Sequence, residues 1–193
     1  MTAGRSEPSD AALLGLFAKG EPAAARLLTQ RLAPRAHGVA LRVLGDRAEA
    51  EDVAQEAMMR LWRMAPDWQP GTAQVSTWLY RVVLNLCLDI KRRRKRRAAR
   101  LDDVPEPADP APGMPERLQQ AARADALQAA LMQLPERQRQ AVVLRHLEDL
   151  SNPQIAEIME ISTEAVESLT ARGKRALGRA LAGQRNELGY SDD

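Results

Sequence analysis

Apolar residues recur along most of the chain at the three- and four-residue spacing of helices that bury one side. Pro34 is expected to begin a helix of its own, because proline fits the first helical turn. Ser76 and Thr77 are expected to cap the helix that follows them. Runs of β-branched residues are few, so the predicted fold class is all-α. The predicted helices cover residues 10–18, 22–33, 34–44, 47–64, 77–90, 118–134, 135–147, 151–160 and 163–181.

The last two of these helices form a pair joined by a short turn. Ser151 and Gln154 make a capping box at the start of the first helix, and Ser162 or Thr163 can cap the second. Such a pair is typical of a helix-turn-helix, whose second helix lies in the major groove of DNA. An ordinary helical hairpin with a solvated basic face stays open as the alternative. The predicted inward stripe of the second helix is Val166, Leu169, Leu177 and Leu181.

Two residues of this pair depart from the helix-turn-helix pattern. Glu160 stands in the turn, where glycine is frequent. Gly173 interrupts the second helix, which costs about 1 kcal/mol relative to alanine. Both residues weaken the DNA-binding interpretation of this stretch taken by itself.

Composition narrows the classes of protein that fit. The 193 residues are 45% hydrophobic and 3% aromatic, which suits one helical domain or two small ones. The single cysteine, Cys87, excludes an internal disulfide and is expected to be a small core residue in a reducing cytoplasm. Cys87, His37 and His146 show no ligand spacing, so neither a metal site nor a cofactor is predicted. No apolar stretch could span a bilayer and no signal-peptide core is visible, so a cytoplasmic protein without membrane contact is expected.

Charge is distributed unevenly, although the formal net charge is only +2. Residues 91–97 are seven consecutive cations, and the natural partner of such a run is a phosphate backbone. A localisation or membrane-surface signal is the weaker alternative, because no apolar face accompanies the run. Prolines and acids follow, which predicts a flexible linker. The predicted organisation is a disordered N-terminus (1–9), a first domain (10–97), the linker (98–117), a second domain (118–183) and a frayed tail (184–193).

Two predicted helices of the first domain carry polar faces. The helix over 47–64 has acids in its first turns, which suits the helix dipole and is explained by a solvated face. In the helix over 77–90, Trp78, Arg81 and Asn85 share a face. An aromatic ring beside arginine and asparagine can capture an unstacked base. From spacing alone, a packing role for Trp78 is the simpler interpretation.

Three runs occur in a fixed order along the chain: LGDRAEAEDVAQEAMMRLWRMAPDW, STWLYRVVLNLCLDIKRRRKR and LPERQRQAVVLRHLEDLSNPQIAEIMEISTEAVESLTARGKRAL. They resemble, respectively, region 2.2 with the start of 2.3, region 2.4, and region 4 of the extracytoplasmic-function (ECF, group IV) sigma factors of the sigma-70 family. The predicted linker falls at the family's domain junction. The resemblance implies a non-enzymatic subunit that directs core RNA polymerase to promoters, with two helical domains joined by a flexible linker.

The resemblance also implies which residues make the contacts, and none of them is catalytic. Asp52, Gln55 and Glu56 match the D-x-x-Q-E pattern that docks on the clamp helices of the polymerase β′ subunit. Region 4 is expected to contact the β flap. Minus-ten contacts are implied for Trp68, Gln69, Trp78, Arg81, Asn85, Lys91 and Arg92, with residues 68–76 as the loop that takes a flipped base. Minus-thirty-five contacts are implied for Thr163, Glu167, Ser168, Ala171, Arg172, Lys174 and Arg175.

The resemblance further implies that a cytoplasmic anti-sigma factor holds the chain, and a one-to-one complex is expected. The AVESL run most resembles the RpoE type paired with the zinc-binding anti-sigma factor ChrR, whose regulon answers photooxidative stress. The zinc there belongs to the partner. Glu167 and Leu169 depart from the family's usual recognition-helix pattern, which has a cation at each of these two positions. The apolar surface that an inhibitor would cover is predicted to include Met58, Met59, Leu84 and Leu88.

Two other classes compete with the sigma factor. A stand-alone helix-turn-helix regulator would need neither the acidic helix over 47–64 nor the match to region 2.4. An enzyme is the weakest interpretation, because the sequence has no phosphate-binding glycine loop, metal cluster or nucleophile–base pair.

Overall fold

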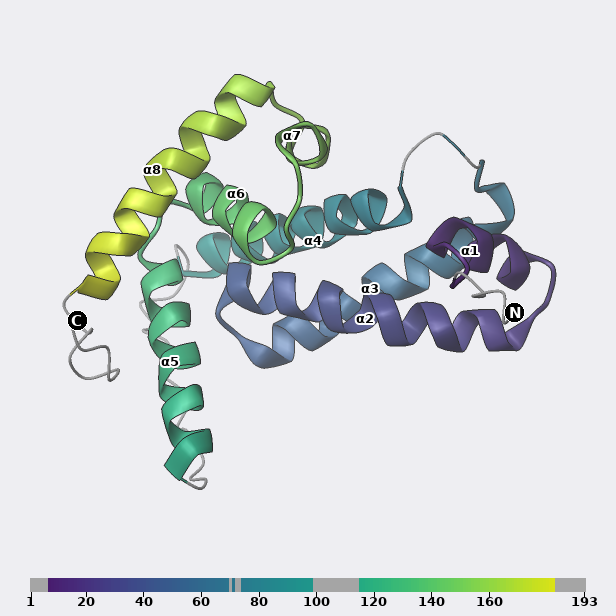
Figure 1. The fold of residues 1–193 in the computed structure, drawn as a ribbon, viewed down its shortest axis with the longest axis horizontal. Coiled ribbons are helices and arrows are strands. Elements are labelled where there is room, and N and C mark those ends of the chain that lie inside the picture. The colour runs from purple at the N-terminus through teal and green to yellow at the C-terminus, as the bar shows by residue number, and fades with distance from the viewer. Residues whose placement is uncertain (1–6, 70, 72–73, 99–114, 183–193) are drawn as a thin grey trace, which may run out of the picture.

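The computed structural model describes residues 7–69, 71, 74–98 and 115–182. Every regular element within these residues is helical, which confirms the all-α prediction. Residues 10–98 form an N-terminal group of helices and residues 115–182 a C-terminal group, and the two lie against each other (Figure 1). None of the helices in this part of the chain has the length and apolar character needed to cross a membrane.

The N-terminal group consists of α1 (Asp10–Ala18), α2 (Pro22–Leu44), α3 (Arg47–Met64), the 3₁₀ turn η1 (Ala65–Asp67) and α4 (Val75–Ala98). Ser9 caps α1 by accepting from the Ala12 N–H at 3.2 Å. Asp46 caps α3 by accepting from the Glu49 N–H at 3.0 Å. Gly45 closes α2 in the left-handed region, with a φ of 74°. These ends lie where the sequence predicted them.

Helix α2 runs through Pro34, so the predicted break at that residue is wrong. Proline removes one backbone donor and crowds the carbonyl of Gln30, four residues earlier. Both Gln30 and Pro34 are exposed, so water can hydrogen-bond the freed carbonyl. Leu28, Leu32 and Ala36 are fully buried on either side of the proline. Packing of the whole helix therefore outweighs the local defect.

Helix α4 begins at Val75, before the residues predicted to cap it. The Trp78 N–H donates to the Gln74 carbonyl at 3.1 Å, which places Ser76 and Thr77 inside the first turn. Thr77 is buried rather than flanking the helix. The prediction of a Ser76–Thr77 cap is therefore wrong, because burial of this turn draws it into the helix.

Helix α4 buries Cys87, as expected for a small core residue, and also Tyr80 and Leu84. The Tyr80 hydroxyl donates to Glu148 of the C-terminal group. Met58 and Leu84 are both buried, so the continuous exposed apolar patch predicted with Met59 and Leu88 does not form.

The C-terminal group consists of α5 (Pro115–Met132), α6 (Glu136–His146), α7 (Asn152–Met159) and α8 (Thr163–Ala182). The capping box of α7 is confirmed, because the Ser151 N–H donates to Gln154 Oε1 at 2.9 Å. Ser162 caps α8 by accepting from the Ala165 N–H at 3.2 Å. Helix α8 packs on α5, α6 and α7, and α7–α8 form the predicted helix-turn-helix (Figure 1). Helix α5 begins at Pro115, and the rest of the predicted linker, residues 99–114, lies outside the described residues together with residues 1–6 and 183–193.

The two residues that departed from the helix-turn-helix pattern have structural explanations. Glu160 adopts a φ of 53°, the left-handed conformation that glycine usually supplies in this turn. Gly173 is buried where α8 crosses α6: a Cβ placed there would lie 2.5 Å from Val142 Cγ2 and 3.1 Å from the Gln138 carbonyl oxygen. Gly173 therefore permits close packing of α8 on α6, which offsets its low helix propensity.

Candidate nucleic-acid and protein interfaces

The outer face of α3 carries a small group of polar residues beside one exposed apolar side chain. Asp52 and Gln55 are exposed and have no hydrogen-bond or ion-pair partner among the described residues. Glu56 accepts from Arg60 at 2.7 Å and lies 3.7 Å from Arg63. The hydrogen bond from Arg60 lowers the pKa of Glu56, so its carboxylate is ionised at neutral pH. The spacing of 52, 55–56 and 59 adds Met59, which is 48% exposed, to the same face.

Helix α4 brings Trp78, Arg81 and Asn85 onto one face, as their spacing predicted. Asn85 is exposed, and Trp78 is half-buried against the core, so packing explains part of its role. Arg81 is held by the C-terminal group: its guanidinium donates to the Glu157 carbonyl, and its Nε lies 3.8 Å from the Glu160 carboxylate. Sequence reasoning did not foresee these partners of Arg81.

The loop that follows η1 contributes two further predicted residues. Gln69 is exposed, and Trp68 is half-buried with its ring against the core. The indole Nε1 of Trp68 is buried without a hydrogen-bond partner in the described part of the chain. A buried donor of this kind is uncommon in folded proteins.

The run of cations at the end of α4 is divided between internal partners and solvent. Lys91 lies 3.5 Å from Glu136 of α6, and Arg92 lies 3.5 Å from Asp89 on its own helix. Burial lowers the pKa of Lys91, and nearby Arg139 lowers it further, while Glu136 opposes both effects. Lys91 is therefore a partly desolvated cation at the contact between the two groups of helices.

Arg94, in the same run of cations, forms ion pairs with the start of α3. Its guanidinium lies 3.0 Å from the Asp46 carboxylate and 2.7 Å from the Glu49 carboxylate. Arg93, Lys95, Arg96 and Arg97 are exposed and have no carboxylate partner within the described residues. The run thus contains cations that hold the protein together and cations that remain available to an external anion.

The predicted recognition face of α8 is largely exposed. The exposed members are Glu167, Ala171, Arg172, Lys174 and Arg175, and the half-buried members are Thr163 and Ser168. The guanidinium of Arg172 folds back on Ser168, its Nε donating to the carbonyl at 3.3 Å. Asn152 of α7 donates to Glu167 at 3.3 Å, which ties the two helices of the motif together. The outer face of α8 thus presents cations and small residues, as direct contact with DNA requires.

Lys174 lies to one side of that face, at the rim of an apolar pocket of about 200 Å³ between α5, α6 and α8. His146 shares the rim, and burial lowers its pKa, with the positive charges of Lys174 and Arg145 adding to the effect. His146 is therefore neutral at pH 7. The lining residues are Leu127, Leu131, Val142, His146, Leu147, Lys174 and Leu177.

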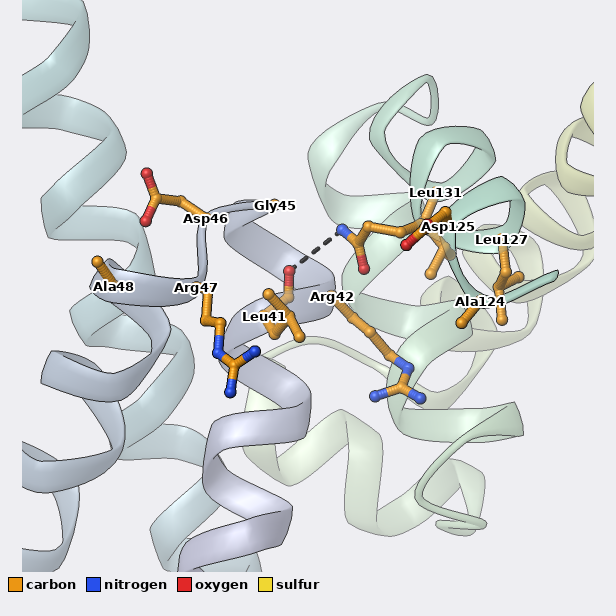
Figure 2. A pocket seen from close by; sticks show the side chains of 11 residues that line it. Leu41, Arg42, Gly45, Asp46, Arg47, Ala48, Ala124, Asp125, Leu127 and Leu131 are labelled. Carbon is orange, nitrogen blue, oxygen red and sulfur yellow. Dashed lines mark hydrogen bonds between the residues drawn. The ribbon is translucent and has the colours of Figure 1, made fainter. Parts of the chain in front are cut away.

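A larger groove of about 780 Å³ lies between the α2–α3 junction and α5 (Figure 2). Gln128 bridges it, with Nε2 donating to the Leu41 carbonyl at 3.1 Å. No motif in the sequence marks this groove, because its two walls come from different domains. It is lined by Leu41, Arg42, Gly45, Asp46, Arg47 and Ala48 on one wall and by Ala124, Asp125, Leu127, Gln128 and Leu131 on the other.

The residues with metal-binding or nucleophilic chemistry are dispersed. Within the parts of the chain that the structure describes, no three His, Cys, Asp or Glu side chains gather closely enough to hold a metal ion. Cys87 is buried, and burial raises the pKa of its thiol to about 12. The thiol is therefore protonated at neutral pH and is a poor nucleophile or ligand.

Comparisons with known proteins agree with the two groups of helices. The model of Sigma-70 region 2 matches residues 28–97, and that of Sigma-70, region 4 matches residues 124–177. The ECF RNA polymerase sigma factor SigM of Mycobacterium tuberculosis (strain H37Rv) is 36% identical over 179 residues, which cover 92% of this chain and 87% of SigM. The ECF sigma factor SigE of Mycolicibacterium smegmatis is 37% identical over 168 residues, covering 85% of this chain but 64% of SigE.

Two solved structures share the fold. The sigma factor RpoE in complex with the anti-sigma factor NepR from Bartonella quintana superposes with a TM-score of 0.69 at 20% identity, covering 81% of this chain and 96% of RpoE. CnrH in complex with the cytosolic domain of CnrY gives a TM-score of 0.66 at 23% identity, covering 91% of this chain and 99% of CnrH. The chain therefore belongs to the ECF RNA polymerase sigma factors of the sigma-70 family, with α2–α4 in region 2 and α5–α8 in region 4.

Proposed function

We propose that this chain binds core RNA polymerase and directs it to promoters. One observation carries the proposal. The region 2 and region 4 matches fall on two helical groups, and the outer faces of α3 and α8 that the sequence assigned to polymerase and DNA are both exposed. Within the described residues, neither face is covered by packing against the rest of the chain. The chain contributes no chemistry of its own and acts by positioning.

In this proposal the α3 face docks on the β′ clamp helices. Asp52, Gln55 and Glu56 supply ionised or polar groups, and Met59 supplies an exposed apolar contact beside them. A mixed surface of this kind suits a protein partner better than a phosphate backbone, which its acids would repel. The apolar pocket at His146 and Lys174, in region 4, is proposed as the site for the β flap.

The DNA contacts are divided between the two regions. Minus-ten bases are proposed to meet Trp68, Gln69, Trp78 and Asn85, with Arg81, Lys91 and Arg92 on the adjacent backbone or bases. The minus-thirty-five duplex is proposed to meet the α8 face, where Arg172 and Arg175 can bind a guanine edge or a phosphate. Glu167 and Ala171 are exposed on the same helix before these cations and are proposed to contribute to the sequence preference.

We further propose a one-to-one complex with an anti-sigma factor in the cytoplasm, which keeps the protein inactive until a stress signal arrives. The structures of RpoE with NepR and of CnrH with the cytosolic domain of CnrY support a partner of this class. The narrower assignment is to the RpoE type with a zinc-binding, ChrR-like inhibitor and a photooxidative regulon. This narrower assignment is based on the AVESL run of α8. Co-expression of the chain with ChrR-like proteins, followed by co-purification, tests it.

The test of the proposed function is run-off transcription with purified core polymerase on a panel of promoter fragments. Asp52→Lys with Glu56→Lys should abolish both core binding and transcripts, because the reversed face meets its partner with the wrong charge. Glu21→Lys with Asp125→Lys carries the same change in charge at exposed sites outside α3 and should leave both intact.

Asn85→Ala separates DNA melting from polymerase binding. Its amide can pair with a base only after the base unstacks, so the variant should bind core normally and form fewer open complexes, as read by permanganate reactivity. A stand-alone helix-turn-helix regulator would bind duplex DNA and show none of these dependences on core polymerase. Transcripts from the Asp52–Glu56 double variant at the wild-type level would overturn the proposal.

A further inference from the structure

The N-terminal half of α8 carries exposed acids whose surroundings differ. Glu164 is held at the start of the helix, where hydrogen bonds from its own backbone N–H and from the Ser162 hydroxyl lower the pKa of its carboxyl group. An acid in the first turn of a helix commonly makes such bonds, because the backbone N–H groups there have no partner within the helix. Glu167 lies beyond those free N–H groups, so the start of the helix does not explain its presence on a face proposed to meet DNA.

Glu167 is an exposed carboxylate without a cation beside it. Residues three and four positions away on a helix are the ones that can pair with it. At these positions stand Thr163, Glu164, Thr170 and Ala171. Among the described residues, the partner of Glu167 is Asn152 of α7, whose Nδ2 donates to Oε1 of Glu167 at 3.3 Å. The charge of the carboxylate is therefore not neutralised within this part of the chain.

Asn152 is well placed to orient the carboxylate of Glu167. It is the first residue of α7 and is half-buried. The capping box of Ser151 and Gln154 fixes this end of α7, and α7 packs against α8 (Figure 1). An asparagine amide is neutral, so it holds one carboxylate oxygen in place without cancelling the charge. The second oxygen of Glu167 remains free to accept a hydrogen bond from outside the chain.

The chemistry of the major groove limits what Glu167 could accept from. A phosphate would repel the carboxylate, which leaves the donors on base edges. Guanine presents the acceptors N7 and O6, and thymine presents the acceptor O4. Adenine presents a donor at N6, but its neighbouring N7 is an acceptor that would face the same carboxylate. The edge of cytosine presents the N4 amino group alone, so cytosine is the base that suits an ionised glutamate.

From this geometry we infer that Glu167, oriented by Asn152, selects cytosine at one position of the minus-thirty-five element and disfavours the other bases there. Glu167 is the specificity-determining residue, and Asn152 is a positioning residue that acts through it. Ala171 lies one turn further along α8 and is exposed, and its small side chain leaves room for the base edge to approach. The inference rests on the proposed function of α8.

The test compares base preferences of holoenzymes that contain the full chain. The probe is a duplex pool made from a promoter fragment that the wild-type holoenzyme transcribes, with the minus-thirty-five element randomised. The retained fraction is sequenced. Glu167→Gln keeps the size of the side chain but supplies an amide, which pairs with N6 and N7 of adenine. Enrichment of cytosine at one position should therefore fall about five- to tenfold, and adenine should become the preferred base there.

The matched control is Glu164→Gln, which makes the same change in charge three residues earlier on the same exposed helix. This control should keep the preference for cytosine, because the carboxylate of Glu164 is engaged at the start of α8. An equal loss of cytosine preference in the control would overturn the inference. So would a Glu167→Gln variant that retains all sequences more strongly by the same factor, because the acid would then act only by repelling phosphate.

A second pair of variants tests the positioning role of Asn152. Asn152→Ala should lower the enrichment of cytosine at the same position by about two- to threefold and leave the other positions unchanged. In a Glu167→Ala background, Asn152→Ala should have no further effect on base preference. Changes at several positions, or the same change in that background, would show that Asn152 acts on the fold of α7 and would overturn its positioning role.

Failure of the proposed function would be seen at an earlier step. The wild-type holoenzyme would then transcribe none of the promoter fragments. Failure of the present inference alone would leave transcription intact, and the wild-type holoenzyme would still enrich particular bases in the pool. In that case Glu167→Gln would change the preference at none of the randomised positions.

Discussion

Gly173→Ala is expected to destabilise region 4, although alanine is the better helix former. The new methyl group would lie 2.5 Å from Val142 Cγ2 and 3.1 Å from the Gln138 carbonyl oxygen. Val142 is 1% exposed and β-branched, so its side chain has little room or freedom to rotate away. The carbonyl belongs to the backbone of α6 and can move only if the helix moves. Helix α8 must therefore shift away from α6.

The magnitude follows from two opposing effects. Replacing glycine by alanine inside a helix favours folding by about 1 kcal/mol. Forcing a methyl group into a close-packed contact costs about 1–3 kcal/mol. The steric effect is the larger here, because neither neighbouring atom sits at the end of a flexible side chain. The expected net loss is about 1 kcal/mol, which would lower the melting temperature of a domain of this size by about 4–8 °C.

The matched control is Gly178→Ala in the same helix. Gly178 is exposed, and nothing lies within 4 Å of the added methyl group, so this variant should be stabilised by about 0.5–1 kcal/mol. Urea unfolding of the full chain should be followed by circular dichroism, because the three tryptophans lie at positions 62, 68 and 78 and their fluorescence reports on region 2 alone. A Gly173→Ala variant as stable as Gly178→Ala would refute the close-packing explanation.

Three further expectations concern single positions. Glu160→Gly should stabilise region 4 by about 0.5–1 kcal/mol, because glycine adopts the φ of 53° without strain; a lower urea midpoint would contradict this. The free energy of unfolding should fall between about pH 9 and 12, because burial raises the pKa of the Cys87 thiol from 9.0 to about 12 and the unfolded chain loses that proton first. Cys87→Ala should flatten this pH dependence. If the free energies of unfolding of Cys87→Ala and wild type run parallel over this pH range, Cys87 is not the cause. Arg94→Gln should lower the urea midpoint, because Arg94 pairs with Asp46 and Glu49. Exposed Arg93 should instead bind phosphate, so Arg93→Gln should reduce the slope of log affinity for promoter DNA against log salt concentration by about 1. Equal effects of the two variants would show that the cation run is not divided as the structure indicates.

Sequence signals located the helix ends where the deciding contacts are local. Ser9, Asp46 and Ser162 each accept from a backbone N–H three residues ahead, and such bonds depend on the chain within one turn. The prediction failed at Pro34 and Thr77, where burial against distant helices decides the outcome. Local propensity is a difference of a few kcal/mol at most, and the packing of several buried side chains exceeds it.

At the candidate interfaces too, features within one helix could be predicted from the sequence, whereas contacts between the two domains could not. Periodicity alone places Asp52 and Gln55 on one exposed face of α3, and it places the α8 cations together. The partners of Arg81 and Lys91 were beyond reach, because Glu157 and Glu136 lie 76 and 45 positions away in the sequence. Those pairs depend on how two domains meet, and the helical period within either domain carries no information about that.

A cation that is placed to bind phosphate is also placed to bind a carboxylate. The chain holds 28 Lys and Arg residues against 26 Asp and Glu residues, so a basic surface on one domain readily finds acids on the other. Carboxylates of the chain and phosphates of DNA bind such cations with different strength. Glu136 and Glu160 each offer one partly exposed carboxylate, whereas DNA offers a line of phosphates and releases condensed counterions when it binds. Promoter DNA should therefore displace the internal carboxylates once polymerase has brought it near, and the carboxylates should hold the cations only in its absence.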